Sequence, residues 1–203
     1  MAVVGVLVFD DVEVLDCCGP FEVFSIASRV ALRRGYVEAP VYFRTSARST
    51  APVVARGGLL LLPSHTIDDH PPLDLLVVPG GVTDEAEADL HLIEWIERVS
   101  LGTSVTASVC NGAFLLATAG LLDGLQVTTH WDDVDALAAR FPAVEVVRER
   151  RWVDEGAVVT SAGVSAGIDM ALHLVARQEG DEIAEAAARQ MEYRWDRGLD
   201  PPR

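Results

Sequence analysis

Short, nearly continuous apolar runs recur along the chain, and most are followed by a turn and then by a segment with helical spacing of apolar residues. Such runs indicate strands that are buried on both faces, as in a parallel sheet. The alternation predicts an α/β fold in which a mostly parallel central sheet lies between layers of helices. The predicted strands cover residues 3–9, 41–44, 75–78, 103–109, 127–129, 144–147 and 152–160, the last with a hairpin turn at Glu155–Gly156.

Apolar residues at helical spacing predict the elements between these strands. The predicted helices cover residues 12–30, 85–99, 111–122, 132–140, 165–177 and 181–193. Gly19–Pro20 should kink or restart the first helix, because proline donates no backbone hydrogen bond. The residues expected on the core faces of the first two helices are Leu15, Phe21, Phe24, Ala27, Leu90, Ile93, Trp95 and Ile96.

The remaining segments are predicted to be irregular or short. Residues 53–55 and 59–62 flank Arg56–Gly58, which predicts a small hairpin. Residues 65–72 are predicted to be a loop, and the prolines of segment 200–203 cannot continue a helix. Without a break in composition, a linker or a repeat, the 203 residues are expected to form one domain, residues 1–203.

Composition and charge narrow the function classes. The net charge of −15, with arginine as the only basic side chain apart from histidine, argues against nucleic-acid partners. The longest apolar run is too short to cross a membrane, and the N-terminus resembles a core strand, so we expect a cytoplasmic protein without a membrane partner. Three cysteines form no disulfide framework, and the five histidines lack the spacing of metal ligands, which predicts no metal site.

Cys110 is the strongest candidate for a catalytic side chain. It directly follows a predicted buried strand and precedes a helix, and the small residues Ser108 and Gly112 lie two positions to either side. This pattern is typical of a nucleophile elbow, a sharp turn that presents a reactive side chain at the carboxyl edge of a sheet. The start of the helix should favour the thiolate form of Cys110.

Two other strand ends are expected at the same edge. Gly80–Gly81 follows one strand and could present backbone N–H groups to a developing negative charge. Asp16 lies early in the first helix, and a carboxyl group held near a thiolate in a dry pocket should have a raised pKa. We therefore expect Cys110 and Asp16 to titrate as a coupled pair.

With these motifs the sequence resembles the ThiJ/PfpI superfamily, and within it the isocyanide hydratase (isonitrile hydratase) branch. The resemblance covers nearly the whole chain. Its segments are Val8–Asp11 with Leu15–Asp16, Gly19–Phe24, Val77–Gly81, Ser108–Ala117, Ala119–Gly124, Thr128–Trp131, Thr160–Gly163 and Ala166–Asp169.

The resemblance implies a flavodoxin-like three-layer sandwich, a homodimer, and a reaction without a cofactor. It also implies that Cys110 is the nucleophile, Asp16 its acidic partner, and Gly80–Gly81 part of an oxyanion-type pocket. Asn111 departs from the pattern, because the hydratases place threonine after the cysteine and the peptidase-like branch places histidine there. Asn111 cannot act as a general base, which argues against a Cys–His protease, but it can orient substrate or water.

Two further features have structural interpretations. His130, in a helix-entry segment, is interpreted as a structural or subunit-contact residue. Cys17 and Cys18 are interpreted as packing residues, and either could line the pocket.

Three functions fit the sequence. The first is hydration of an isocyanide, a small-molecule electrophile, to an N-substituted formamide through a thioimidate on Cys110. The second is glyoxalase-like or deglycase-like activity on small α-oxoaldehydes. The third is non-catalytic ligand or redox sensing, because the domain also resembles the N-terminal half of some AraC-type regulators.

Overall fold

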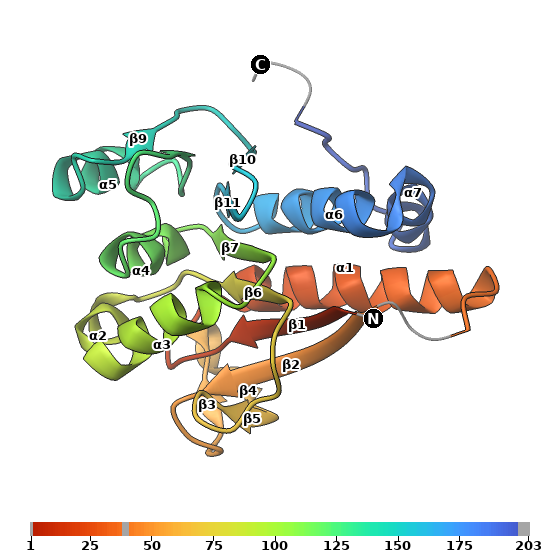
Figure 1. The fold of residues 1–203 in the computed structure, drawn as a ribbon, viewed down its shortest axis with the longest axis horizontal. Coiled ribbons are helices and arrows are strands. Elements are labelled where there is room, and N and C mark those ends of the chain that lie inside the picture. Colours follow the sequence, from red (N-terminus) through yellow and green to blue (C-terminus); the bar gives the residue numbers. More distant parts are fainter. Residues whose placement is uncertain (1, 38–40, 199–203) are drawn as a thin grey trace.

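A computed structural model describes residues 2–37 and 41–198, and a mixed sheet lies at its centre (Figure 1). In their order across the sheet, the strands are β10 (Trp152–Asp154), β11 (Val158–Ser161), β7 (Val105–Val109), β6 (Leu75–Val78), β1 (Ala2–Leu7), β2 (Val41–Ala47) and β5 (His65–Thr66). Neighbouring strands are parallel except β10 and β11, which form an antiparallel hairpin. The predicted mostly parallel α/β sheet is confirmed.

Helices cover both faces of the sheet (Figure 1). One layer consists of α1 (Val14–Arg33), α6 (Ala166–Glu179) and α7 (Asp181–Gln190), which pack on one another. The other layer contains α2 (Asp84–Ala88), α3 (Leu90–Ser100) and α4 (Gly112–Thr118). The strands β8 (Gln126–Val127) and β9 (Glu145–Val146) pair with each other and adjoin α5 (Val134–Arg140).

The side chains of the central strands alternate between two hydrophobic cores. In β6, Leu75 and Val77 face the core beneath α1 and α6, whereas Leu76 and Val78 face the core beneath α3 and α4. All four are fully buried. Burial on both faces explains why these strands are continuous apolar runs in the sequence, and it confirms the three-layer, flavodoxin-like architecture.

The first helix differs from the prediction in two ways. α1 does not restart at Pro20 but continues from Val14 to Arg33 as one helix. Its packing on α6 and α7 outweighs the one backbone hydrogen bond that proline cannot donate. Phe24 and Ala27 are fully buried as expected, but Leu15 is 37% and Phe21 is 41% exposed.

The predicted second helix, residues 85–99, is two helices. Asp89 has an extended backbone and caps α3, because its side chain accepts a hydrogen bond from the Leu92 N–H at 3.2 Å. An aspartate at this position favours a new helix start over continuation. Ile93, Trp95 and Ile96 are buried as predicted, whereas Leu90 is largely exposed.

Smaller segments were predicted with mixed success. The hairpin is present as β3 (Val53–Val54) and β4 (Leu60–Leu61), joined through the 3₁₀ turn Arg56–Gly58. The predicted loop 65–72 instead begins with β5, which extends the sheet by pairing with the end of β2. The helix predicted for 111–122 ends at Thr118. The proline-containing segment 200–203 lies outside the described residues. Within the described part of the chain, no helix is long and apolar enough to span a membrane.

The end of β6 and the start of α4 approach each other closely. Val78 pairs with Ser108, so the carboxyl ends of β6 and β7 lie side by side. A Cβ atom at Gly112 would lie 2.3 Å from the Val78 carbonyl oxygen and 2.9 Å from the Pro79 carbonyl carbon. Only glycine fits between α4 and this strand end.

We therefore expect Gly112→Ala to destabilise the protein by about 2–3 kcal/mol, because backbone atoms cannot move aside as a side chain can. Gly102→Ala is the matched control, since the nearest atom to its Cβ position is 3.6 Å away. Urea unfolding of both variants measures the effect. Equal midpoints for the two variants would contradict the close approach.

Candidate active site

Cys110 occupies a sharp turn between β7 and α4. Its φ is 58°, in the left-handed region that non-glycine residues seldom adopt. Hydrogen bonds hold the strained backbone: the Cys110 N–H donates to the carbonyl oxygens of Ser161 at 3.2 Å and Ala162 at 3.3 Å, and the Thr129 hydroxyl donates to the Cys110 carbonyl at 2.9 Å. The turn predicted from the sequence is present, and the thiol is 9% exposed.

Asp16 lies in the first turn of α1 and is fully buried. Its Oδ2 accepts a hydrogen bond from the Gly80 N–H at 3.1 Å. Its Oδ1 is buried without a hydrogen-bond partner among the described groups. A Cβ atom at Gly80 would lie 2.1 Å from the Asn111 Oδ1 and 3.1 Å from the Asp16 Oδ2. Glycine at position 80 thus lets the backbone lie between Asp16 and Asn111.

Asn111 is bonded to the loop after β6. Its Oδ1 accepts a hydrogen bond from the Gly81 N–H at 2.9 Å, and its Nδ2 donates to the Gly81 carbonyl at 3.0 Å. The N–H groups of Gly80 and Gly81, which the sequence suggested for an oxyanion-type pocket, therefore already donate to Asp16 and Asn111. Their role as donors to a substrate stays a prediction. In the structure, these N–H groups position the Asp16 carboxyl group and the Asn111 amide group.

The site also includes Val164, which was not predicted from the sequence. It has a φ of 51°, which is unusual for a β-branched residue. Its N–H favours the charged forms of both Asp16 and Cys110, lowering the pKa of each. The preceding Gly163 packs against the ring of His130, where a Cβ would lie 2.1 Å from the His130 Cδ2. The contact gives His130 a packing role beside the site.

Burial, aided by the nearby Glu13 charge, raises the pKa of Asp16 from 3.8 to about 7, although the Gly80 N–H, the Cys110 thiol and the Val164 N–H each lower it. The direction agrees with the expectation for a carboxyl group in a dry pocket. An Asp16 carboxyl with a pKa of about 7 can both accept and donate a proton at neutral pH.

The thiol pKa shifts in the opposite direction from the one expected. Burial first, and then the Asp16 charge, raise the pKa of Cys110 to about 12, although the N–H groups of Asn111 and Val164 lower it. Desolvation and a neighbouring carboxylate thus outweigh the helix start. At neutral pH, sulfur holds the proton, and Asp16 is the group that titrates first.

The other candidates from the sequence lie around this pair. Cys17 is buried in α1 and donates to the Val14 carbonyl at 3.2 Å, and the Cys18 sulfur is 3.8 Å from the Cys17 sulfur. All three cysteines are free thiols. Across residues 2–37 and 41–198, no group of three or more histidine, cysteine, aspartate or glutamate side chains could hold a metal ion.

Comparison with known proteins gives consistent matches over most of the chain. The model of the DJ-1/PfpI family matches residues 2–177. The isonitrile hydratase of Pseudomonas putida is 32% identical over 94% of this chain and 78% of its own length. A crystal structure of a ThiJ/PfpI family protein from Pseudomonas syringae is similar with a TM-score of 0.84 at 31% identity, covering 96% of this chain and 76% of that one.

Transcriptional regulators share the same domain. The HTH-type regulator GbdR of Pseudomonas aeruginosa is 27% identical over 94% of this chain, but this chain spans only 50% of the regulator. The relatives thus include both an enzyme and a regulator.

We expect Asp16→Asn to stabilise the protein at pH 8 and to give little gain at pH 5. The folded-state pKa of Asp16 lies above its unfolded value of 3.8, so the folded state binds more protons between pH 4 and 7, and stability falls as the pH rises through this window. Above pH 7, where Asp16 is ionised in both states, its raised pKa lowers the free energy of unfolding by roughly 4 kcal/mol. After the cost of burying an amide, we expect a gain of about 2 kcal/mol, or about 4–8 °C in Tm. Thermal unfolding at both pH values measures the difference, and an equal change at pH 5 and pH 8 would contradict the raised pKa.

Proposed function

The chain belongs to the DJ-1/PfpI family, and on that premise we propose that it hydrates an isocyanide to an N-substituted formamide with Cys110 as nucleophile and Asp16 as proton carrier. The observation that carries the proposal is the buried pair itself. A thiol on a strained turn adjoins a buried carboxyl group whose pKa is about 7 and whose Oδ1 has no partner among the described groups. The similarity to an isonitrile hydratase selects the reaction from those that such a pair can catalyse.

In the first step, the Asp16 carboxylate accepts the thiol proton while the Cys110 sulfur bonds to the terminal carbon of the isocyanide. Asp16 then donates this proton to the same carbon, which gives a thioimidate on Cys110. Because Asp16 takes up the proton as sulfur attacks, catalysis does not require a free thiolate beforehand. The raised pKa of Cys110 is therefore compatible with its role.

In the second step, water adds across the carbon–nitrogen double bond of the thioimidate. The water oxygen bonds to carbon while Asp16 accepts a proton from the water, and Asp16 then passes this proton to the nitrogen. The carbon–sulfur bond then breaks, the hydroxyl proton returns through Asp16 to sulfur, and the formamide leaves. The sum is isocyanide plus water giving formamide, with no change of oxidation state that would require a cofactor.

Asn111 and Gly80 act as positioning residues in this proposal. Gly80 orients Asp16 through its N–H, and Asn111 fixes the Gly81 backbone through two hydrogen bonds. Since the Asn111 amide is engaged at both ends, the threonine that the hydratases place here can be replaced without loss of the nucleophile or the acid. The replacement is expected to alter substrate preference.

The proposal includes a homodimer in the cytoplasm. Leu15 and Phe21 on α1 and Leu60 on the β4 hairpin are exposed apolar side chains that a second copy can cover. Three free thiols fit a reducing compartment.

We expect formamide from cyclohexyl isocyanide in the presence of the protein, detected by mass spectrometry. Cys110→Ala should lose activity by roughly 10³-fold or more, because the covalent route is removed. Cys18→Ser, on the same helix as Asp16, is the thiol control and should retain activity. No formamide, or undiminished turnover by Cys110→Ala, would refute the hydratase proposal. If the protein forms no formamide but converts methylglyoxal to lactate, the α-oxoaldehyde activity is favoured instead.

The pH dependence tests Asp16 separately. The kcat/KM of the wild type should rise with pH and level off above an apparent pKa of about 7, because Asp16 must be ionised to accept the thiol proton. Asp16→Asn should lower kcat/KM about 10²–10⁴-fold and abolish this inflection. An unchanged inflection in Asp16→Asn would assign the titrating group to another residue.

A second candidate function is sensing, favoured by the similarity to the regulator GbdR. Peroxide oxidation of Cys110 would be the sensing event, but it requires the thiolate. With a thiol pKa of about 12, the reaction is expected to be slow at neutral pH. Rapid stoichiometric oxidation of Cys110, without turnover of isocyanide, would favour the sensor.

A further inference from the structure

A large cavity adjoins the Cys110 turn from outside, because Thr129 and Ala162 in its lining hydrogen-bond the Cys110 backbone. Its volume is about 1050 Å³, and its lining comes from three segments, residues 128–134, 149–152 and 193–198, together with Ala162 and Asp169. The lining includes none of Cys110, Asp16, Gly80 or Asn111. A cavity of this size can hold an organic molecule of several rings.

Aromatic side chains form much of the wall. Three of the four tryptophans of the chain, Trp131, Trp152 and Trp195, line the cavity together with Tyr193. Trp131 is 77% exposed, which is unusual for so large an apolar side chain. Aromatic walls of this kind bind flat apolar rings by stacking and edge contacts.

Contacts with neighbouring residues hold the aromatic walls in place. The Trp152 ring stacks on His173 with the centroids 3.9 Å apart. The Trp195 indole N–H donates to the Asp169 carbonyl at 3.2 Å, and the Arg197 guanidinium lies 4.3 Å from the centre of the Trp195 ring. The cavity is thus formed before any ligand arrives.

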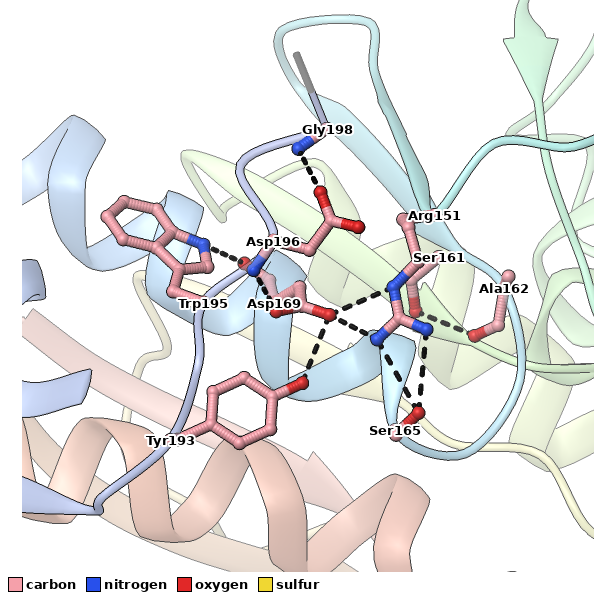
Figure 2. A network of polar contacts seen from close by, with 9 residues as sticks. All are labelled: Arg151, Ser161, Ala162, Ser165, Asp169, Tyr193, Trp195, Asp196 and Gly198. Atoms are coloured by element: carbon pink, nitrogen blue, oxygen red, sulfur yellow. Dashed lines mark hydrogen bonds and ion pairs between the residues drawn. The ribbon is translucent and has the colours of Figure 1, made fainter. Parts of the chain in front are cut away.

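A buried carboxylate ties the C-terminal wall to α6. Figure 2 shows Asp169 between Tyr193 and Trp195 on one side and Arg151 on the other. Its Oδ2 accepts hydrogen bonds from the Arg151 Nε at 2.9 Å and the Tyr193 hydroxyl at 3.1 Å, and its Oδ1 accepts from the Asp196 N–H at 2.9 Å. Asp169 is fully buried, and this network fixes the lining residues that it joins in place.

The charge around the cavity differs from that of the chain. Four arginines and three acidic residues line it, in a protein with a net charge of −15. Arg151 pairs with Asp169, and Arg197 pairs with Asp181 and Glu185. The side chains of Arg150 and Arg194 form no ion pair or hydrogen bond with any residue that the structure describes, which leaves two guanidinium groups available to an anion.

We propose that this cavity is a second binding site, for a small aromatic carboxylate. The aromatic walls match the ring of such a ligand, and the forked guanidinium groups of Arg150 and Arg194 match a carboxylate, which arginine binds through paired hydrogen bonds. Asp169 is neutralised by Arg151, so Arg150 and Arg194 attract an anion against the opposing carboxylates of Glu149 and Asp196, and the neutral analogue tests which pair dominates.

The test is a titration with benzoate, with benzamide as the neutral analogue of the same shape. Tryptophan fluorescence reports binding because three of the four tryptophans line the cavity, and calorimetry gives an independent dissociation constant. We expect saturable binding of benzoate by the wild type and by Cys110→Ala, and at least about tenfold weaker binding of benzamide. Because Cys110→Ala lacks the nucleophile, benzoate binding by this variant tests the cavity independently of the hydratase activity. The binding proposal and the hydratase proposal can therefore fail separately.

Variants locate the ligand. Arg150→Gln combined with Arg194→Gln should weaken benzoate binding at least about tenfold, because both carboxylate partners are lost. Arg98→Gln is the matched control, an exposed arginine on α3 outside the cavity, and should bind as the wild type does. Absence of saturable binding, equal affinity for benzamide, or equal affinity of the double variant and Arg98→Gln would overturn the proposal.

Discussion

The close approach of the β6 carboxyl end to the first turn of α4 determines where the groups of the site lie. Two glycines allow it: Gly112 faces the Val78 carbonyl, and Gly80 fits between Asn111 and Asp16. A side chain at either position would push the strand end and the helix apart. The Asp16 carboxyl group on α1 would then lose the Gly80 N–H as its hydrogen-bond donor. Glycine at these positions is therefore required both for close packing and for the electrostatics of Asp16.

Burial gives the site its chemistry at a cost in stability. The pKa of Asp16 rises to about 7 because the carboxyl group is removed from water and has few hydrogen bonds. The same desolvation keeps the proton on the Cys110 sulfur. A more fully hydrogen-bonded carboxylate would make the fold more stable, but it would be a weaker base toward the thiol at neutral pH.

The sequence predicted the sheet, the elbow at Cys110 and the proximity of Asp16 and Gly80, because strand ends follow from periodicity and parallel strands place their carboxyl ends together. It could not predict Val164, whose role depends on a backbone N–H and an unusual φ. It gave the wrong sign for the thiol pKa, because the helix start was visible in the sequence whereas the depth of burial was not. Leu15 and Phe21 were misplaced because one helical pattern leaves several choices of face.

The backbone of Cys110 is held from widely separated parts of the chain. Its N–H donates to the carbonyls of Ser161, the last residue of β11, and Ala162, and its carbonyl accepts a hydrogen bond from the Thr129 hydroxyl. Asp16 comes from the other end of the chain. During synthesis, Asp16 therefore emerges from the ribosome before the thiol, whereas the groups that hold the Cys110 backbone, from Thr129, Ser161 and Ala162, emerge only after it. The turn at Cys110 can therefore be completed only after β11 and Ala162 have been added, late in the synthesis of the chain.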